Sequence, residues 1–166
     1  VMALARVGRY PQGCPRLLFK YPWQIAENVD AYSGLGWAGC PKTRKSTNGG
    51  CLTSGSHPIK SWSSKQSVIC TISGGAEFYG VVKASGIGFG YPALLGDLGW
   101  SVPLRVWTGS TATIGICGRS GLGKLRHIDT RALWNQQRVN DSSVALREVK
   151  GECNPADLFA KHLPSG

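Results

Sequence analysis

The spacing of hydrophobic and polar positions gives three segments in the first half of the chain strand character. These segments are residues 27–39, 49–64 and 66–73. A basic, turn-rich stretch, residues 41–50, separates the first segment from the others. The pattern predicts three consecutive strands that pair as an antiparallel meander.

From Ala76 the apolar residues recur at three- and four-residue steps as far as Asp97, which is helical spacing. The segment also holds four interior glycines and a proline: Gly80, Gly86, Gly88, Gly90 and Pro92. Each interior glycine costs about 1 kcal/mol relative to alanine. The sequence therefore predicts a long helix that is kinked or broken near residues 86–92.

The second half of the chain alternates strands with helices. We expect, in order, a strand at 103–108, helices at 110–117 and 127–139, a strand at 143–151 and a helix at 155–163. Three antiparallel strands followed by this alternation predict an α/β fold with a mixed five-stranded sheet flanked by helices. Residues 1–28 contain three prolines and are predicted to be a connecting lead-in, so the domain is expected to span residues 29–166.

Composition narrows the class of partner. Nineteen Lys and Arg against nine Asp and Glu give a net charge of +10, which favours a polyanion such as nucleic acid. The alternative is a basic surface that serves only solubility. The six cysteines include no C-x-x-C pair, so zinc has little support, and most are expected to be buried thiols.

The chain begins at Val1 and has no apolar run of signal-peptide or membrane-spanning length. We therefore expect an intracellular protein without a membrane span, cut or processed from something longer. Trp37, Trp107 and Trp134 lie at positions typical of packed side chains, so we expect them to pack rather than to stack on bases.

Six ordered blocks carry a more specific pattern: residues 31–50, 59–66, 72–80, 106–117, 121–137 and 154–163. Together they resemble the ribonuclease H domain at the end of copia-type retrotransposon polyproteins, over about residues 29–163. The lead-in is similar to the segment that joins the reverse transcriptase to that domain. The resemblance implies a ribonuclease H-like fold that hydrolyses RNA–DNA hybrids with two Mg²⁺ ions.

In that family, acidic residues in four of the blocks bind the metal ions. The resemblance places Gly34 and Gly36 at the two aspartates of the first block, Gly75 at the glutamate of the next and Gly109 at a third aspartate. Only Asp157 keeps its carboxylate. Glycine has no side-chain oxygen, and Mg²⁺ requires several hard oxygen ligands. We therefore predict that the chain holds no metal and is catalytically inactive.

Two nearby acids were candidates to replace the missing carboxylates. Glu77 lies about 200° around the helix from Gly75, so it is expected to point away from the site. Asp30 lies four residues before Gly34 on the same strand, about 13 Å away. The acids replaced by glycine fall on the metal-binding motifs. This pattern favours either deliberate inactivation or loss of catalysis after the domain took on a non-catalytic role. A systematic A-to-G change in the Asp and Glu codons is also consistent with it.

Basic side chains near the blocks are candidates for contact with a nucleic-acid backbone, with plain solvation as the alternative. They are Lys42, Arg44 and Lys45, and then Lys124, Arg126 and His127. The leading hypothesis is an inactive ribonuclease H-like domain of retroelement origin that still binds RNA–DNA hybrid or duplex. The alternative is a domesticated, non-enzymatic structural or interaction subunit of a larger complex.

Overall fold

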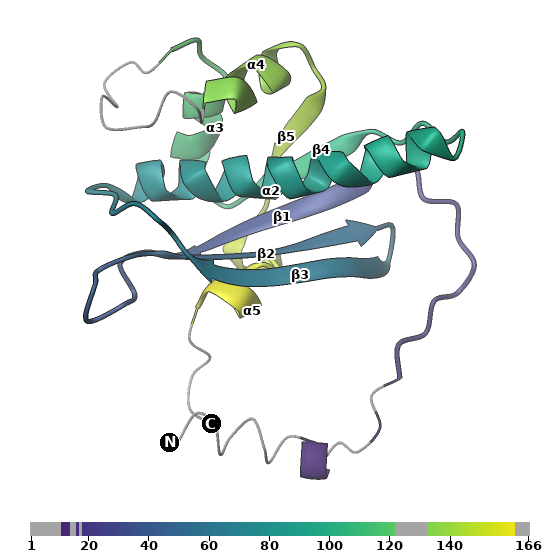
Figure 1. The fold of residues 1–166 in the computed structure, drawn as a ribbon, viewed down its shortest axis with the longest axis horizontal. Coiled ribbons are helices and arrows are strands. Elements are labelled where there is room, and N and C mark those ends of the chain that lie inside the picture. Colours follow the sequence, from purple (N-terminus) through teal and green to yellow (C-terminus); the bar gives the residue numbers. More distant parts are fainter. Residues whose placement is uncertain (1–10, 14–15, 17, 122–132, 162–166) are drawn as a thin grey trace.

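A five-stranded mixed sheet forms the centre of the computed structural model, which describes residues 11–13, 16, 18–121 and 133–161 (Figure 1). The strands are β1 (Val29–Gly36), β2 (Thr47–Ser54), β3 (His57–Lys65), β4 (Leu104–Thr108) and β5 (Val144–Glu148). Their order in the sheet is β3-β2-β1-β4-β5. The first three strands are antiparallel, while β4 pairs parallel with β1 and β5 parallel with β4. The predicted fold class is confirmed.

Helices cover both faces of this sheet. They are α2 (Ser73–Asp97), α3 (Thr111–Cys117), α4 (Trp134–Asn140), the 3₁₀ turn η2 (Gly151–Cys153) and α5 (Asp157–Ala160). Figure 1 shows α2 running across one face with α3 and α4 beside it, and α5 on the other face. The order of elements is the predicted one. None of the helices in the described ranges is long and apolar enough to cross a membrane.

The main core lies between α2, α3 and the sheet. Alternate residues of β1 point toward α2, so Val29 and Ala31 are fully buried with Val106 of β4 and with Phe78 and Val81 of α2. Burial of each large apolar side chain contributes about 1.5–3 kcal/mol. This packing fixes α2 along β1 and β4, with Gly80 beside Ser33 and Gly88 beside Leu104 at the start of β4.

The structure corrects the predicted strand boundaries. Residues 49–64 are not one strand, because a turn at Gly55, with φ of +55°, separates β2 from β3. Residues 66–73 are not a strand, because residues 66–72 form a loop that leads into α2 at Ser73. The side chain of Gln66 holds this loop by donating to Asn48 Oδ1 at 2.6 Å and to the Ala76 carbonyl at 2.7 Å.

Of the predicted kink or break in the long helix, the break is wrong, because α2 is helical through all 25 residues. Local propensity is overridden here by packing against the sheet. Gly88 allows α2 to approach β4 closely, since a Cβ atom there would lie 2.7 Å from Leu104 Cδ1. Pro92 lies inside the helix, five residues before its end.

Among the described residues of the lead-in, residues 18–28 form neither helix nor strand before Val29. The Gln24 side chain nevertheless attaches this segment to the β2–β3 turn. Its amide donates to the Ser54 carbonyl at 2.6 Å, and its oxygen accepts from the Ser56 backbone N–H at 3.1 Å.

Candidate functional site

Two of the glycines singled out in the sequence lie side by side where parallel strands end. Ser33 of β1 pairs in register with Thr108 of β4, so Gly34 and Gly109 follow at neighbouring positions. The carboxyl-terminal edge of parallel strands is where α/β folds collect functional side chains. The structure therefore brings these two positions together, as the sequence predicts.

Asp157 joins them from the opposite end of the chain. Asn154 donates from its side chain to the Ser33 carbonyl at 3.0 Å and accepts from the Ala156 backbone N–H at 3.2 Å. These bonds dock the start of α5 on β1. A Cβ atom built on Gly34 would lie 2.8 Å from Asp157 Oδ1, so the aspartate covers the vacant position directly.

Glu77 also faces this site, which corrects the expectation that it points away. Glu77 shares a helix face with Val81, Ala84 and Gly88, because these positions follow at four, seven and eleven residues. That face packs on the sheet, where Val81 and Ala84 are fully buried. The charges of Asp157 and Lys161 both act on the Glu77 carboxyl.

Gly75 lies about 160° around α2 from this face and so is turned away from the sheet. We therefore replace Gly75 by Glu77 in the candidate site, and Asp157 is not the sole acid there. The residues of the site are Gly34, Glu77, Gly109 and Asp157. The sequence feature that indicates Glu77 is its spacing from the apolar residues of the same helix face. The resemblance to a short motif points to Gly75 instead.

The electrostatics of the two acids are unequal. Burial, and after it the negative charge of Asp157, raise the pKa of Glu77 to about 7, with Lys161 acting in the opposite direction. Lys161 forms an ion pair with Asp157, with Nζ 2.5 Å from Oδ2, one helical turn further along. The Glu77 carboxyl therefore holds its proton more strongly than an exposed glutamate does.

The residues present do not fit a pair of divalent cations. Two carboxylates converge on the site, and one of them is already bonded to Lys161. Gly34 and Gly109 contribute no side-chain oxygen. Across the described parts of the chain, no three His, Cys, Asp or Glu side chains gather into a group that could hold a metal ion. Two Mg²⁺ ions need more oxygen ligands than this arrangement offers.

Helix α5 also occupies space that longer side chains would need. A Cβ atom on Gly34 would lie 2.9 Å from the Ala156 carbonyl carbon. Cβ atoms on Gly36 and Gly49 would collide with the backbone of Ala160. Glycine at these three positions lets α5 sit directly on β1 and β2. A carboxylate at position 34 or 36 requires α5 to move outward.

Solved structures with the same architecture are ribonucleases H. LC11 ribonuclease H1, isolated from compost by a metagenomic approach, matches with a TM-score of 0.56 at 15% identity, over 81% of this chain and 93% of its own. The N-terminal ribonuclease H domain of a Mycobacterium tuberculosis protein matches with a TM-score of 0.53 at 18% identity, over 81% of this chain and 91% of the other. The chain has a ribonuclease H-like fold.

The same fold recurs in a larger viral enzyme. The prototype foamy virus protease-reverse transcriptase matches with a TM-score of 0.54 at 14% identity, over 84% of this chain and 21% of the viral chain. A structure of LC11 ribonuclease H1 in complex with an RNA/DNA hybrid matches with a TM-score of 0.50 at 13% identity, over 80% and 94% of the two chains. No protein-family model matches the sequence.

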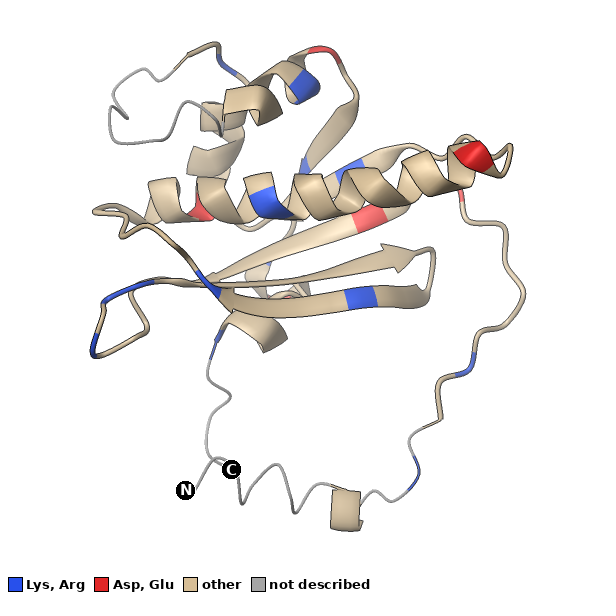
Figure 2. Ribbon diagram, in the orientation of Figure 1, with Lys and Arg blue, Asp and Glu red and all other residues tan. Residues whose placement is uncertain are grey.

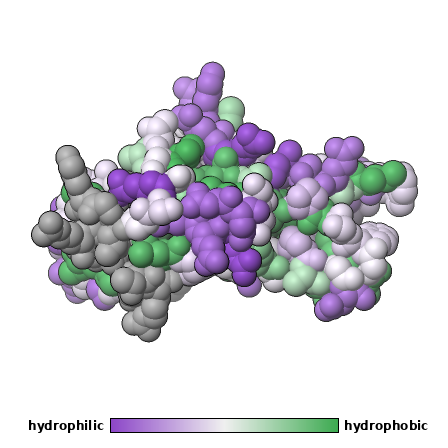
Figure 3. Space-filling view, turned by 90° about the horizontal axis from the view of Figure 1, so that it is seen from above, coloured by the Kyte–Doolittle hydropathy of each residue, from purple (hydrophilic) through white to green (hydrophobic). Residues whose placement is uncertain are grey.

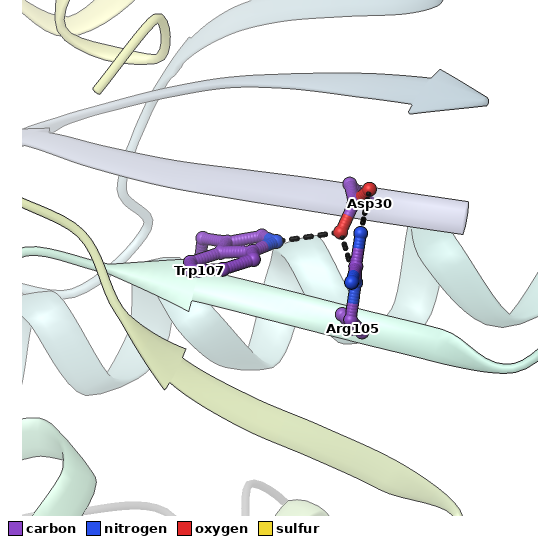
Figure 4. A network of polar contacts seen from close by, with 3 residues as sticks. All are labelled: Asp30, Arg105 and Trp107. Carbon is purple, nitrogen blue, oxygen red and sulfur yellow. Dashed lines mark hydrogen bonds and ion pairs between the residues drawn. The ribbon is translucent and has the colours of Figure 1, made fainter. Parts of the chain in front are cut away.

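Asp30 takes no part in the site of this ribonuclease H-like domain. It is buried and accepts from Arg105 Nε and Nη2, each at 2.7 Å, and from Trp107 Nε1 at 2.6 Å (Figure 4). Trp107 in turn stacks on Tyr32, with ring centroids 5.9 Å apart. This cluster ties β1 to β4 on the face opposite α2, so its role is structural, and Trp107 packs as predicted.

Basic residues surround the site at the same edge of the sheet. Lys42 and Arg44 are exposed and Lys45 is half-buried in the loop that leaves the carboxyl-terminal end of β1 (Figure 2). Lys65, at the end of β3, and Lys161 lie at this edge too. The other three predicted contacts, Lys124, Arg126 and His127, lie outside the described residues.

Trp37 is more exposed than the sequence predicts. Its side chain is 52% exposed and lines a hollow of about 410 Å³ together with Lys65, Lys161 and Cys40. Hydrogen bonds from the side chain and backbone of Thr43 lower the pKa of the Cys40 thiol to about 7. The hollow thus presents an aromatic ring and two ammonium groups, a combination suited to a nucleotide.

Proposed function

We propose that this ribonuclease H-like domain, of retroelement origin, binds RNA–DNA hybrid or a related duplex and does not cleave it. The carrying observation is the composition of the site at the ends of β1 and β4. Two glycines stand beside two acids there, and a lysine is bonded to one of the acids. The copia-type origin rests on the resemblance of the ordered sequence blocks.

The absence of cleavage follows from the chemistry of phosphodiester hydrolysis. In the two-metal reaction, paired cations activate the attacking water and stabilise the leaving oxygen. Burial raises the pKa of Glu77 to about 7, so at neutral pH a cation at this site competes with a proton for the carboxylate. Asp157 is neutralised by Lys161. No group at the site can take over the role of two dications.

The positive charge of the domain supports nucleic-acid binding independently of any catalytic activity. The net charge of +10 is accompanied by exposed cations on the loop after β1, at the edge where the site lies. Backbone phosphates are the natural partners of such cations. A ribonuclease H1 of the same fold has been solved with an RNA/DNA hybrid, which makes the hybrid the first ligand to test.

The test measures binding and cleavage on the same sample. Fluorescence anisotropy with a labelled RNA–DNA hybrid of about 18 base pairs, between 50 and 300 mM KCl, is expected to show affinity that falls steeply with salt. Incubation with Mg²⁺ or Mn²⁺ is expected to leave the hybrid intact. Affinity that is absent at every salt concentration would refute the binding role, and metal-dependent cleavage would refute the inactivity.

A second candidate, an interaction subunit of a larger complex, is favoured by apolar residues at the far end of the molecule. Trp23, Leu98 and Trp100 are 87%, 68% and 67% exposed. Trp23 and Trp100 line a hollow of about 610 Å³ between the lead-in and the end of α2, and Figure 3 shows hydrophobic residues at this end of the molecule. Binding to a protein partner that is lost in Trp100→Ser, with hybrid affinity unchanged, would support this role.

A further inference from the structure

A third hollow lies on the flank of the domain, between the end of β3 and α2. Its volume is about 250 Å³, equal to about eight water molecules at about 30 Å³ each, which is room for a phosphate group. The polar residues that line it are Ser64, Lys65, Ser67, Tyr79, Lys83 and the buried pair Asn48 and Gln66.

The hollow is cationic and contains no acid. Lys83 Nζ donates to Ser64 Oγ, and Lys65 Nζ lies 3.7 Å from Cys40 Sγ. Neither ammonium group forms an ion pair with any described residue. Two ammonium groups with adjacent hydroxyl groups make a site for an anion, and a phosphate oxygen accepts hydrogen bonds from both kinds of donor.

The walls of the hollow are held in place before any ligand binds. Gln66 anchors the β3–α2 loop to the sheet. Its backbone N–H donates to the Ser46 carbonyl at 2.8 Å, in addition to the bonds from its side chain to Asn48 and Ala76. Asn48 and Gln66 are each 5% exposed. A preformed hollow loses little conformational entropy when it binds its ligand.

Lys65 connects this hollow to the candidate site. It lines both the flank hollow and the hollow that contains Trp37 and Lys161, and Lys161 is bonded to Asp157. The ammonium groups of Lys161, Lys65 and Lys83 therefore follow one another from the site toward α2. A nucleic-acid strand that enters the site can continue along this line.

We propose that Lys65 and Lys83 together bind one backbone phosphate of the nucleic acid in the flank hollow, outside the carboxylate site. The assignment rests on the proposed binding of nucleic acid and adds to it a fixed contact on one strand. Since both lysines serve the same phosphate, the loss of either weakens the contribution of the other.

The experiment compares Lys65→Met, Lys83→Met and the double variant with the unmodified chain in the salt-dependent anisotropy assay. Loss of one phosphate contact reduces the slope of log K against log salt by about 0.9 and the affinity at 0.1 M salt by about 8-fold. Lys60→Met removes the same charge from β3 five residues away and is expected to change neither. Lys83→Arg keeps the charge and is expected to retain the slope.

The outcomes separate this proposal from the proposed function. A double variant with the slope and affinity of Lys60→Met, while the unmodified chain binds, overturns the phosphate assignment alone. Failure of the unmodified chain to bind hybrid at any salt overturns both. Circular dichroism and urea unfolding of each variant show that the comparison is made between folded proteins.

Discussion

Replacing Glu77 with glutamine tests whether the candidate site strains the folded protein. Burial and the charge of Asp157 raise the pKa of Glu77 from 4.5 to about 7 in the folded state. In the unfolded chain the carboxyl titrates near its ordinary value. Between these two values the folded state therefore holds a proton that the unfolded state has released.

The sign and size of the effect follow from this difference. The free energy of unfolding falls as the pH rises from about 4.5 to about 7, because the folded state binds more protons in this range. A difference of about 2.5 pKa units at about 1.36 kcal/mol each is about 3 kcal/mol, fully expressed above pH 7. Glutamine keeps the shape of the side chain and cannot ionise. Glu77→Gln is therefore expected to be about 3 kcal/mol more stable at pH 8 and unchanged at pH 4.

Urea unfolding followed by circular dichroism, at pH values from 4 to 8, measures this difference directly. The exposed carboxylate of Glu148 on β5 provides the control, and Glu148→Gln is expected to differ from the parent by less than about 0.5 kcal/mol. Equal stability of Glu77→Gln and the parent at pH 8 would show that Glu77 lies in solvent and not against Asp157. Our placement of Glu77 in the site would then be wrong.

Three further predictions concern packing, the buried ion pair and thiol chemistry. Gly34→Ala is expected to lower the free energy of unfolding in urea by about 1–3 kcal/mol, because the added Cβ meets α5. In the control Gly109→Ala the Cβ lies 3.6 Å from its nearest neighbour, so the change is expected to be less than about 0.5 kcal/mol. Equal effects of the two substitutions would contradict the close packing of α5 on β1. Asp30→Ala is expected to lose about 1.5–3 kcal/mol, because it removes the buried acceptor of the half-buried Arg105 guanidinium and of the Trp107 indole N–H, and a loss below about 0.5 kcal/mol would place Asp30 in solvent. At pH 7 a maleimide is expected to modify Cys40 about 100-fold faster than Cys117, whose pKa burial raises to about 11; mass spectrometry of the labelled peptides identifies the site, and equal rates would contradict the difference.

The sequence predicts the order of elements and the meeting of Gly34, Gly109 and Asp157, because both rest on strand alternation and on ordered blocks. The sequence does not predict that α2 is unbroken. The glycine at position 88 lets the helix pack closely against Leu104. That contact joins residues distant in the sequence. Propensity alone therefore gives the wrong answer for this helix.

The error at Glu77 has a similar cause. A motif aligned letter by letter placed Gly75 in the site, whereas the face of a helix is set by which residues reach the sheet. Asp30 shows the same limit, since its partners Arg105 and Trp107 come from β4 and are found only once β1 and β4 are paired. Trp37 follows the end of β1, and its side chain is exposed although strand alternation predicts that it packs.

The central claim, that the domain binds hybrid without cleaving it, is tested most directly by a hydrolysis assay on the unmodified chain. The assay uses a uniformly labelled RNA–DNA hybrid over a range of Mg²⁺ and Mn²⁺ concentrations, with calorimetric titration of each ion in parallel. Two acids, one of them bonded to Lys161, are expected to give no saturable binding of a metal pair and no cleavage, although the hybrid is bound. Cleavage that requires the metal and disappears in Asp157→Asn would show that the site is a working nuclease centre and would contradict the account.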